Sequence, residues 1–278
     1  MNKLEYKRIK NKFLFSLSAI VLTANLAYGS LLESVVRDAS SDFRKITNSA
    51  FQVGERLTFE INYGFITAGQ AVMTIPGYKY INGRKAYEIN TYAVSTESFD
   101  KIFKVRDKYS TFVDVEGIFP HRFEQHVREG KYSRDYEAFF DQEELKAEAG
   151  DKKYTIPQYV NDILSAFYYI RTIDLAKYRK GQKVQLQNFY DGKVHPLDVM
   201  ILGRQKIEVE AGTFDCIVVE PLVVEGGLFK NEGSIKVWLT NDANKIPVKM
   251  QSKVVVGNID VVLIKYEGLR NPATARSE

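Results

Sequence analysis

Few residues of this chain have the types and spacing that catalysis or metal binding would need. His121 and His126 are five positions apart in an expected strand, so their side chains point to opposite faces and cannot share one metal. Ser165 lacks the Gly-x-Ser-x-Gly elbow that exposes a nucleophile, and no phosphate-binding glycine loop is found. Acidic residues are plentiful, but local spacing marks out no pair for acid–base work. The sequence therefore indicates no catalytic residue, no metal site and no cofactor, and it does not favour an enzyme.

Cys216 is the single cysteine and lies in Phe214-Asp215-Cys216-Ile217-Val218-Val219, a run with the composition of a buried strand. One cysteine cannot form an internal disulfide, and no neighbouring histidine could polarise the thiol. We interpret Cys216 as a structural residue.

Arg171 is the polar residue with the clearest functional alternative. On a helical projection it shares a stripe with Val160, Leu164 and Phe167, the face expected to meet a sheet. A guanidinium buried there needs a carboxylate or several carbonyls as partners. It could be an anion clamp for a lipid head group or an acidic sugar, or a helix C-terminal cation whose stem lies along the sheet, which we favour. The candidate ligand-binding residues are Arg171, Asp162, Tyr168 and Trp238.

A short helix is expected to position three of these candidates. Apolar residues recur at helical spacing from Ile163 to Ile170, which predicts a helix over 161–172. Asn161 or Asp162 can serve as the N-cap by accepting from the first amides of the helix.

The rest of the chain has the pattern of strands. Leu57, Phe59, Ile61 and Tyr63 alternate with polar residues, as in a half-buried strand. The last strand, Ile259 to Tyr266, is apolar on both faces, and residues 142–153 are charged and expected to form a loop. These patterns predict a mainly β fold of antiparallel curved sheets, an open barrel or a sandwich, with one short central helix.

A weak internal repeat with a fixed offset indicates two related halves. Glycine, proline and the apolar phase between them recur together, which is typical of a duplicated unit. The matched residues are Gly54 and Gly181, Tyr63 and Tyr190, Val72-Met73 and Val199-Met200, Pro120 and Pro247, Val127 and Val254, and Gly130 and Gly257. We expect a single β-rich domain over 51–268, made of half one (51–141), the helix (161–172) and half two (181–268).

The segment 1–29 has the pattern of a secretory signal peptide. Five cations and one acid precede an apolar stretch from Phe13 to Ala27, and Ala27-Tyr28-Gly29 is a small-x-small cleavage site. Cleavage there would leave a formally neutral chain, because the net charge of +4 lies in this segment, and nucleic acid is not expected as a partner. With no cysteine after the apolar stretch, we expect a soluble periplasmic or exported protein that is not a lipoprotein, with a flexible lead-in at 30–50 and a tail at 269–278.

Several motifs, in order, resemble an exported bacterial family, domain-of-unknown-function family 3108. They are Phe51-Gln52-Val53-Gly54-Glu55-Arg56-Leu57, Tyr63-Gly64, Ala68-Gly69, the run from Asp162 to Arg171, Ala211-Gly212-Thr213-Phe214, Val237-Trp238-Leu239-Thr240-Asn241-Asp242, Ile246-Pro247-Val248 and Gly257. The resemblance covers nearly all of the chain from Phe51 to Gly268. It implies an envelope-exported, mainly β protein, and it assigns no catalytic residues.

Three functions remain open. The leading hypothesis is a non-catalytic periplasmic or envelope-assembly protein that binds a lipid, a lipoprotein or a glycan, with an envelope protein as a further possible partner. The second is an integral outer-membrane β-barrel, although the polar C-terminal end and the central helix argue against it. The third is a cell-wall hydrolase, which would need acidic residues that converge only in the folded protein.

Overall fold

The computed structural model describes residues 43–223, 235–253 and 257–277. The expected signal peptide, its cleavage site and residues 30–42 of the expected lead-in lie outside the described residues. Residues 43–50 belong to the packed fold, since Ala50 is fully buried and Arg44 bonds to a distant turn.

Antiparallel strands make up most of the described chain, which confirms the mainly β fold predicted from the alternating pattern. Helices α2 (Glu97–Asp100) and α3 (Ile163–Thr172) and a 3-10 turn (Leu175–Lys177) interrupt them. The strands are β1 (Arg56–Tyr63), β2 (Ile66–Ile81), β3 (Arg84–Ser95), β4 (Arg106–Asp114), β5 (Pro120–Glu129), β6 (Tyr132–Asp141), β7 (Lys146–Ala149), β8 (Lys152–Thr155), β9 (Lys183–Tyr190), β10 (Lys193–Val209), β11 (Gly212–Val223), β12 (Ile235–Thr240), β13 (Pro247–Lys253), β14 (Asn258–Glu267) and β15 (Arg276–Ser277).

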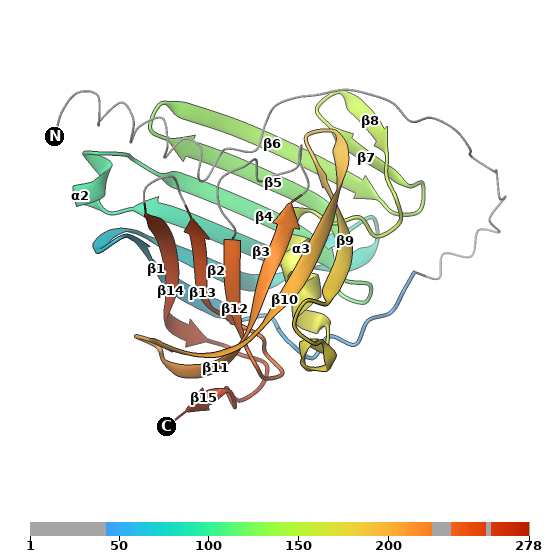
Figure 1. Ribbon diagram of the computed structural model, residues 1–278. Helices are drawn as coiled ribbons and strands as arrows, with labels where there is room; N and C mark the ends of the chain where they lie inside the picture. The colour runs from blue at the N-terminus through green and yellow to red at the C-terminus, as the bar shows by residue number, and fades with distance from the viewer. Residues whose placement is uncertain (1–42, 224–234, 254–256, 278) are drawn as a thin grey trace.

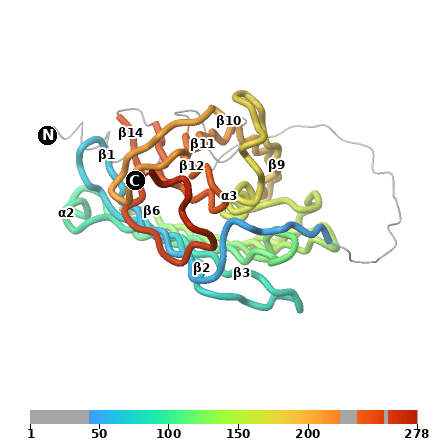
Figure 2. The backbone as a smooth tube through the Cα atoms, turned by 90° about the horizontal axis from the view of Figure 1, so that it is seen from below, coloured from blue at the N-terminus to red at the C-terminus, as the bar shows by residue number. Residues whose placement is uncertain are grey.

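All of these strands belong to one open, curled sheet. Its order is β8-β7-β6-β5-β4-β3-β2-β1-β14-β13-β12-β11-β10-β9, and β15 pairs with β11. Figures 1 and 2 show α3 between the two parts of the sheet, so the sheet has an inner face that packs on the helix and an outer face. An open antiparallel sheet around a central helix is the architecture expected from the sequence.

The strand order supports the two related halves. Strands β1 to β6 and β9 to β14 each run in sequence order across the sheet, as two equivalent meanders. The offset that relates Gly54 to Gly181 also matches the first residues of three strand pairs, namely Arg56 and Lys183, Ile66 and Lys193, and Pro120 and Pro247. The apparent repeat therefore corresponds to equivalent strands in the same order, and it is more than a shared preference for hairpins.

The correspondence includes an arginine ahead of each meander. Arg44 and Arg171 are related by the same offset, and each donates from Nε to a carbonyl in the turn before the fifth strand of its half. The acceptors, Gly117 O at 2.8 Å and Asn244 O at 3.1 Å, are again related by that offset. This pair of contacts extends the repeat upstream of the motifs that first indicated it.

The sheet stays open because extra chain lies between its two outer ends. In the middle of the sheet, the first strand of one half pairs with the last strand of the other, β1 with β14. The equivalent pairing, β9 with β6, does not occur among the described strands. Instead, β6 pairs with the hairpin β7–β8, and Asn161, on the way to α3, exchanges backbone hydrogen bonds with β9.

That hairpin is a difference from the expected loop at 142–153. The charged residues that suggested a loop, Lys146, Glu148, Lys152 and Lys153, are exposed on the edge strands. Ala147 between them is fully buried. Two strands of four residues are too short to give a clear alternating pattern, and this explains the error.

Two layers of core hold the curled sheet. The larger clusters fill the space between the inner face and α3, and they include Phe59, Ile89, Tyr168 and Leu263. A smaller cluster lies on the outer face, where the bent β10–β11 hairpin covers strands β12 to β14; it includes Phe214, Trp238, Val248 and Tyr266. Within the residues that the structure describes, no helix has the length and apolar character needed to cross a membrane.

Candidate functional site

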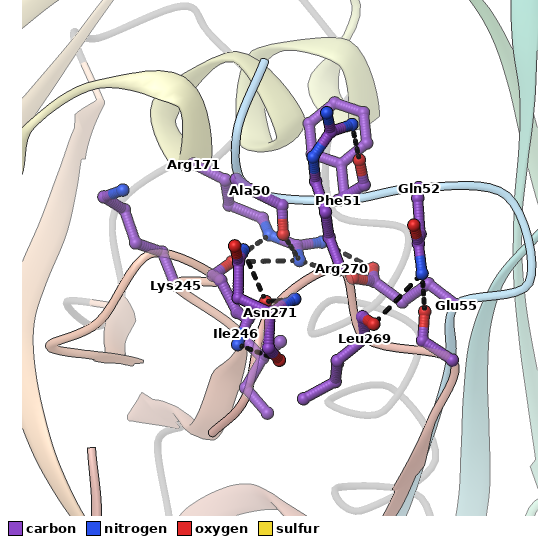
Figure 3. Close-up of polar contacts among 12 residues, drawn as sticks. Ala50, Phe51, Gln52, Glu55, Arg171, Lys245, Ile246, Leu269, Arg270 and Asn271 are labelled. Atoms are coloured by element: carbon purple, nitrogen blue, oxygen red, sulfur yellow. Dashed lines mark hydrogen bonds and ion pairs between the residues drawn. The ribbon is translucent and has the colours of Figure 1, made fainter. Parts of the chain in front are cut away.

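Arg171, the leading candidate from the sequence, is a fully buried hub (Figure 3). Its Nη1 and Nη2 donate to the two carboxylate oxygens of Glu55, both at 2.7 Å. Nε and Nη2 also donate to Asn244 O, at 3.1 and 3.0 Å. Burial alone would lower the pKa of Arg171, but the Glu55 carboxylate outweighs burial and raises it. The carboxylate and carbonyl partners that a buried guanidinium requires thus come from within the chain.

The hub joins segments from both ends of the chain. Asn244 Nδ2 donates to Asn271 O at 3.0 Å, and Asn271 N donates to Asn244 Oδ1 at 2.9 Å. Close by, Gln52 Nε2 donates to Leu269 O at 3.0 Å (Figure 3). Glu55 and Arg171 both lie in motifs on which the family resemblance rests, so part of that resemblance reflects a shared structural contact.

Asp162 and Tyr168 also have structural contacts. Asp162 is the N-cap of α3, and its Oδ1 accepts from Leu164 N at 2.8 Å and Ser165 N at 3.0 Å. Tyr168 is fully buried, with its ring against Phe51 at 4.9 Å, and burial raises the pKa of its phenol. The candidates Arg171, Asp162 and Tyr168 all come from one helix and its cap, yet none presents a free polar group to the solvent.

Trp238 lies apart from them, on the outer face. Its side chain belongs to the small cluster under the β10–β11 hairpin, and Nε1 donates to Gln205 Oε1 at 2.8 Å. Only 7% of Trp238 is exposed. The structure therefore brings three of the four sequence candidates together and places the fourth across the sheet.

A continuous apolar row crosses the inner face, and the sequence motifs did not reveal it. Direct cross-strand pairing links six residues on β1, β14, β13, β12, β11 and β10, in that order: Ile61, Val261, Met250, Val237, Val219 and Ile201. We call this set the inner apolar row. Its members belong to the two clusters that also contain side chains of α3.

The row is buried at one end and partly exposed at the other. Ile201 and Val219 are buried, whereas Ile61, Met250 and Val261 are partly exposed although they point toward the helix. Phe167 of α3 packs against both clusters and is also partly exposed. These four side chains form a partly exposed apolar surface on the inner face, and apolar lining of this kind is typical of ligand-binding surfaces.

Polar side chains line the inner face on the other half of the sheet. Asp107 on β4 and Glu129 at the end of β5 are buried, and their carboxyl groups form a hydrogen bond. Burial raises the pKa of the Asp107 carboxyl, and the bonds from Arg128 N and with Glu129 offset this only in part. The folded protein therefore favours the protonated form of Asp107 more than the unfolded chain does. Because both side chains are shut off from solvent, the pair lacks the access to substrate of the two acids of a glycoside hydrolase.

The raised pKa of Asp107 leads to a prediction for the pH dependence of stability. The folded state favours the protonated carboxyl, so its contribution is present below the unfolded pKa of about 3.9 and is lost as pH rises through the folded pKa. In Asp107→Asn the amide donates to Glu129 without an added proton. We expect the free energy of unfolding to change little near about pH 4 and to rise by on the order of 1 kcal/mol near about pH 8.

Urea denaturation at the two pH values measures this difference. The control is Asp151→Asn, which changes an exposed carboxylate in the β7–β8 turn. It should have the same small effect on the free energy of unfolding at both pH values. A loss of stability for Asp107→Asn at the higher pH would mean that the native pair is fully ionised.

Another buried carboxylate, Asp114, organises the turn after β4. Asp114 Oδ1 accepts from Gly117 N at 2.7 Å, and Oδ2 accepts from Arg84 Nε at 2.6 Å and contacts His121 Nε2 at 3.1 Å. Burial alone would raise the pKa of Asp114, but His121, Arg84 and the Gly117 amide outweigh it and lower the pKa. His121 is thereby explained as a structural partner of the turn that follows β4.

The fold and the inner face define the class of protein to which this chain belongs. In this class, an open antiparallel sheet curls around a helix and carries an apolar row on its inner face. The chain belongs to the family DUF3108, "Protein of unknown function", whose model matches residues 58–264. The resemblance drawn from the sequence motifs is thereby confirmed. No curated protein matches the chain.

One solved structure supports the fold. The chain is similar to a beta-barrel-like protein of domain of unknown function DUF1849 from Brucella abortus, with a TM-score of 0.51 and 13% identity, covering 77% of this chain and 97% of that one. It is more distantly similar to a candidate lipoprotein from Parabacteroides distasonis, with a TM-score of 0.35 and 10% identity over 81% of this chain and 99% of that one. At these identities, the first similarity supports the barrel-like fold and neither assigns a function.

Proposed function

We propose that this protein is an exported, non-catalytic component of the bacterial cell envelope that binds an acyl chain on its inner face. The observation that carries the proposal is the partly exposed end of the inner apolar row, formed by Ile61, Val261 and Met250 beside Phe167 of α3. An acyl chain, from a lipid or from a lipidated protein, is the ligand whose chemistry fits a surface of this composition.

The surface has a long apolar continuation. The inner apolar row leads from these exposed residues to Val237 and Ile201 without a polar residue in between. The opposite half of the inner face bears the partly exposed rings of Tyr109 and Tyr136, whose amphipathic character suits an amphipathic ligand. Export rests on the signal-peptide pattern of residues 1–29.

Matched substitutions on β14 test the proposal. Val261 and Val262 are neighbours, both partly exposed, and they point to opposite faces of the sheet. The protein is produced with its own signal segment, and bound acyl species are measured by native mass spectrometry and organic extraction. We expect the wild type and Val262→Glu to retain an acyl ligand and Val261→Glu to lose most of it.

Met250→Gln provides a milder change on the same surface in case Val261→Glu unfolds. Thermal unfolding of each variant separates loss of ligand from loss of fold. A wild-type protein that neither co-purifies with an acyl species nor takes up a fluorescent fatty acid contradicts the proposal, as does equal retention by Val261→Glu and Val262→Glu. Extraction also distinguishes a free lipid from a lipidated peptide.

A further inference from the structure

One end of the sheet carries exposed apolar side chains that the packing of the fold does not require. Phe65, in the turn between β1 and β2, is 99% exposed, and the neighbouring Ile66 is 44% exposed. Ile102, just after α2, is 39% exposed. Figures 1 and 2 place the β1–β2 hairpin and α2 at the same end of the molecule. We call this end the rim.

The internal repeat shows that Phe65 is not needed to form the hairpin. The equivalent hairpin of the second half joins β9 and β10, and the position that the repeat matches to Phe65 is Gly192. That turn is packed, because Asp191 is bound by Arg134 Nη2 at 2.9 Å and Gly192 lies against the ring of Tyr154. The β1–β2 turn instead presents a large apolar side chain to solvent, an arrangement typical of a surface that meets a partner.

The rim is also positively charged. Lys101 and Lys104 flank Ile102, Lys131 stands in the β5–β6 turn, and all three are exposed. A hydrogen bond of 2.8 Å from Gly130 N to Lys104 O holds that turn beside the segment after α2. Lys253, near the end of β13, is exposed as well, and Gly64 N donates to Asn258 O at 3.4 Å across the same end of the sheet.

Acidic side chains do not balance this charge in the part of the rim that the structure describes. Of the two acids of α2, Glu97 is exposed, and Asp100 is already paired with Arg106. Arg106 Nη2 lies 2.6 Å from Asp100 Oδ2. Apolar side chains at hairpin tips with lysines around them suit an anionic bilayer surface, where the apolar tips enter the acyl boundary and the lysines meet the head groups.

A buried apolar cluster at the rim contacts the proposed ligand surface. At the rim, α2 packs on the strands through a cluster that contains Ala68, Phe99, Phe103 and Val105. Ile61 and Tyr63 pack against this cluster, and Ile61 is also the first member of the inner apolar row. A series of packed apolar side chains therefore leads from α2, at the rim, through Ile61 to the inner face.

We propose that the rim docks on an anionic lipid bilayer through Phe65, Ile66 and Ile102, with the surrounding lysines holding the head groups. Docking here deepens the proposed function, because an acyl chain would pass between the bilayer and the inner face at this rim. Only this passage of an acyl chain rests on the proposed function. The docking itself depends only on the exposed apolar tips and the charge.

Vesicle flotation with the mature protein tests the docking. The vesicles are phosphatidylethanolamine with phosphatidylglycerol, compared with phosphatidylcholine alone. We expect the wild type to float with the anionic vesicles at low salt and to be released at high salt. Phe65→Ser should lower the partition coefficient roughly tenfold, and Lys101→Gln with Lys104→Gln should lower it several-fold on anionic vesicles.

Tyr80→Ser is the matched control. Tyr80 is 73% exposed and lies near the tip of the β2–β3 hairpin. This hairpin projects from another part of the molecule (Figure 2). The Tyr80→Ser substitution should therefore leave flotation unchanged. Absence of flotation with both kinds of vesicle overturns the docking, as does equal flotation of Phe65→Ser and the wild type. A stable complex with a protein, formed through Phe65 in the absence of vesicles, overturns it as well.

The two proposals fail in different measurements. Phe65→Ser is expected to keep its acyl ligand, and Val261→Glu is expected to keep its vesicle binding. If vesicle binding depends on Phe65 while no acyl ligand is ever retained, docking stands and the proposed function fails. The reverse outcome removes the docking and leaves the ligand surface.

Discussion

Replacing Arg171 with methionine is expected to destabilise the protein by about 3–5 kcal/mol. The substitution leaves the Glu55 carboxylate, only 1% exposed, without its counter-charge, and it removes both donors to Asn244 O. A buried charge without its partner destabilises the protein far more than the intact ion pair stabilises it. Urea denaturation followed by the fluorescence of Trp238 measures the change in the free energy of unfolding.

Two further variants separate the ion pair from its surroundings. Glu55→Leu combined with Arg171→Met should recover much of the lost stability, because no buried charge then remains. Lys177→Met removes a cation from an exposed pair with Asp174 and should change stability by less than about 1 kcal/mol. If Arg171→Met keeps wild-type stability but loses a bound ligand, Arg171 is the anion clamp and not a structural residue.

Replacing Asp114 with alanine is expected to cost about 3 kcal/mol near neutral pH. The change removes the acceptor for Arg84 and His121, and it leaves the buried Gly117 amide without its partner. The turn that these bonds hold also provides the carbonyls bound by Arg44. The lead-in segment and the turn should therefore loosen together, and amide hydrogen exchange can measure that opening.

The lowered pKa of Asp114 gives this loss a definite pH dependence. A carboxyl whose folded pKa lies below its unfolded pKa of about 3.9 stabilises the protein fully above that value and loses the effect as pH falls toward the folded pKa. The difference between wild type and Asp114→Ala should shrink as the pH is lowered from about 7 to about 3. Asp135→Asn, in an exposed pair with Arg128, should have little effect over this range. A difference that stays constant with pH would show that Asp114 acts only through shape.

Local patterns predicted the elements of this fold well. The alternation of Leu57, Phe59 and Ile61 marked β1, and the helical spacing with its cap at Asp162 marked α3. The fixed offset of the repeat correctly indicated two halves, because glycines with positive φ such as Gly54 and Gly181 stand at equivalent turns. Each of these elements was marked by residues close together in the chain, and the repeat only compared such local patterns.

The candidate surface could not be predicted in the same way, because it depends on strand register. Ile61 and Val261 are direct partners across β1 and β14, although these strands lie near opposite ends of the described chain. A change of one residue in register would turn these side chains to the other face. The partner of Arg171 was missed for a related reason, since Glu55 lies in a different motif, and only folding brings the two together.

Photolabelling with a fatty acid that carries a diazirine group at the end of its chain tests the ligand surface most directly. The probe is bound to the mature protein and activated by light, and the labelled peptides are then mapped by mass spectrometry. If an acyl chain lies on the inner face, the adducts will fall at Phe167, Met250 and Val261, and an excess of unlabelled fatty acid will remove them. Adducts at Trp238 or Val262 on the outer face, or labelling that the excess does not reduce, would contradict an acyl-binding inner face.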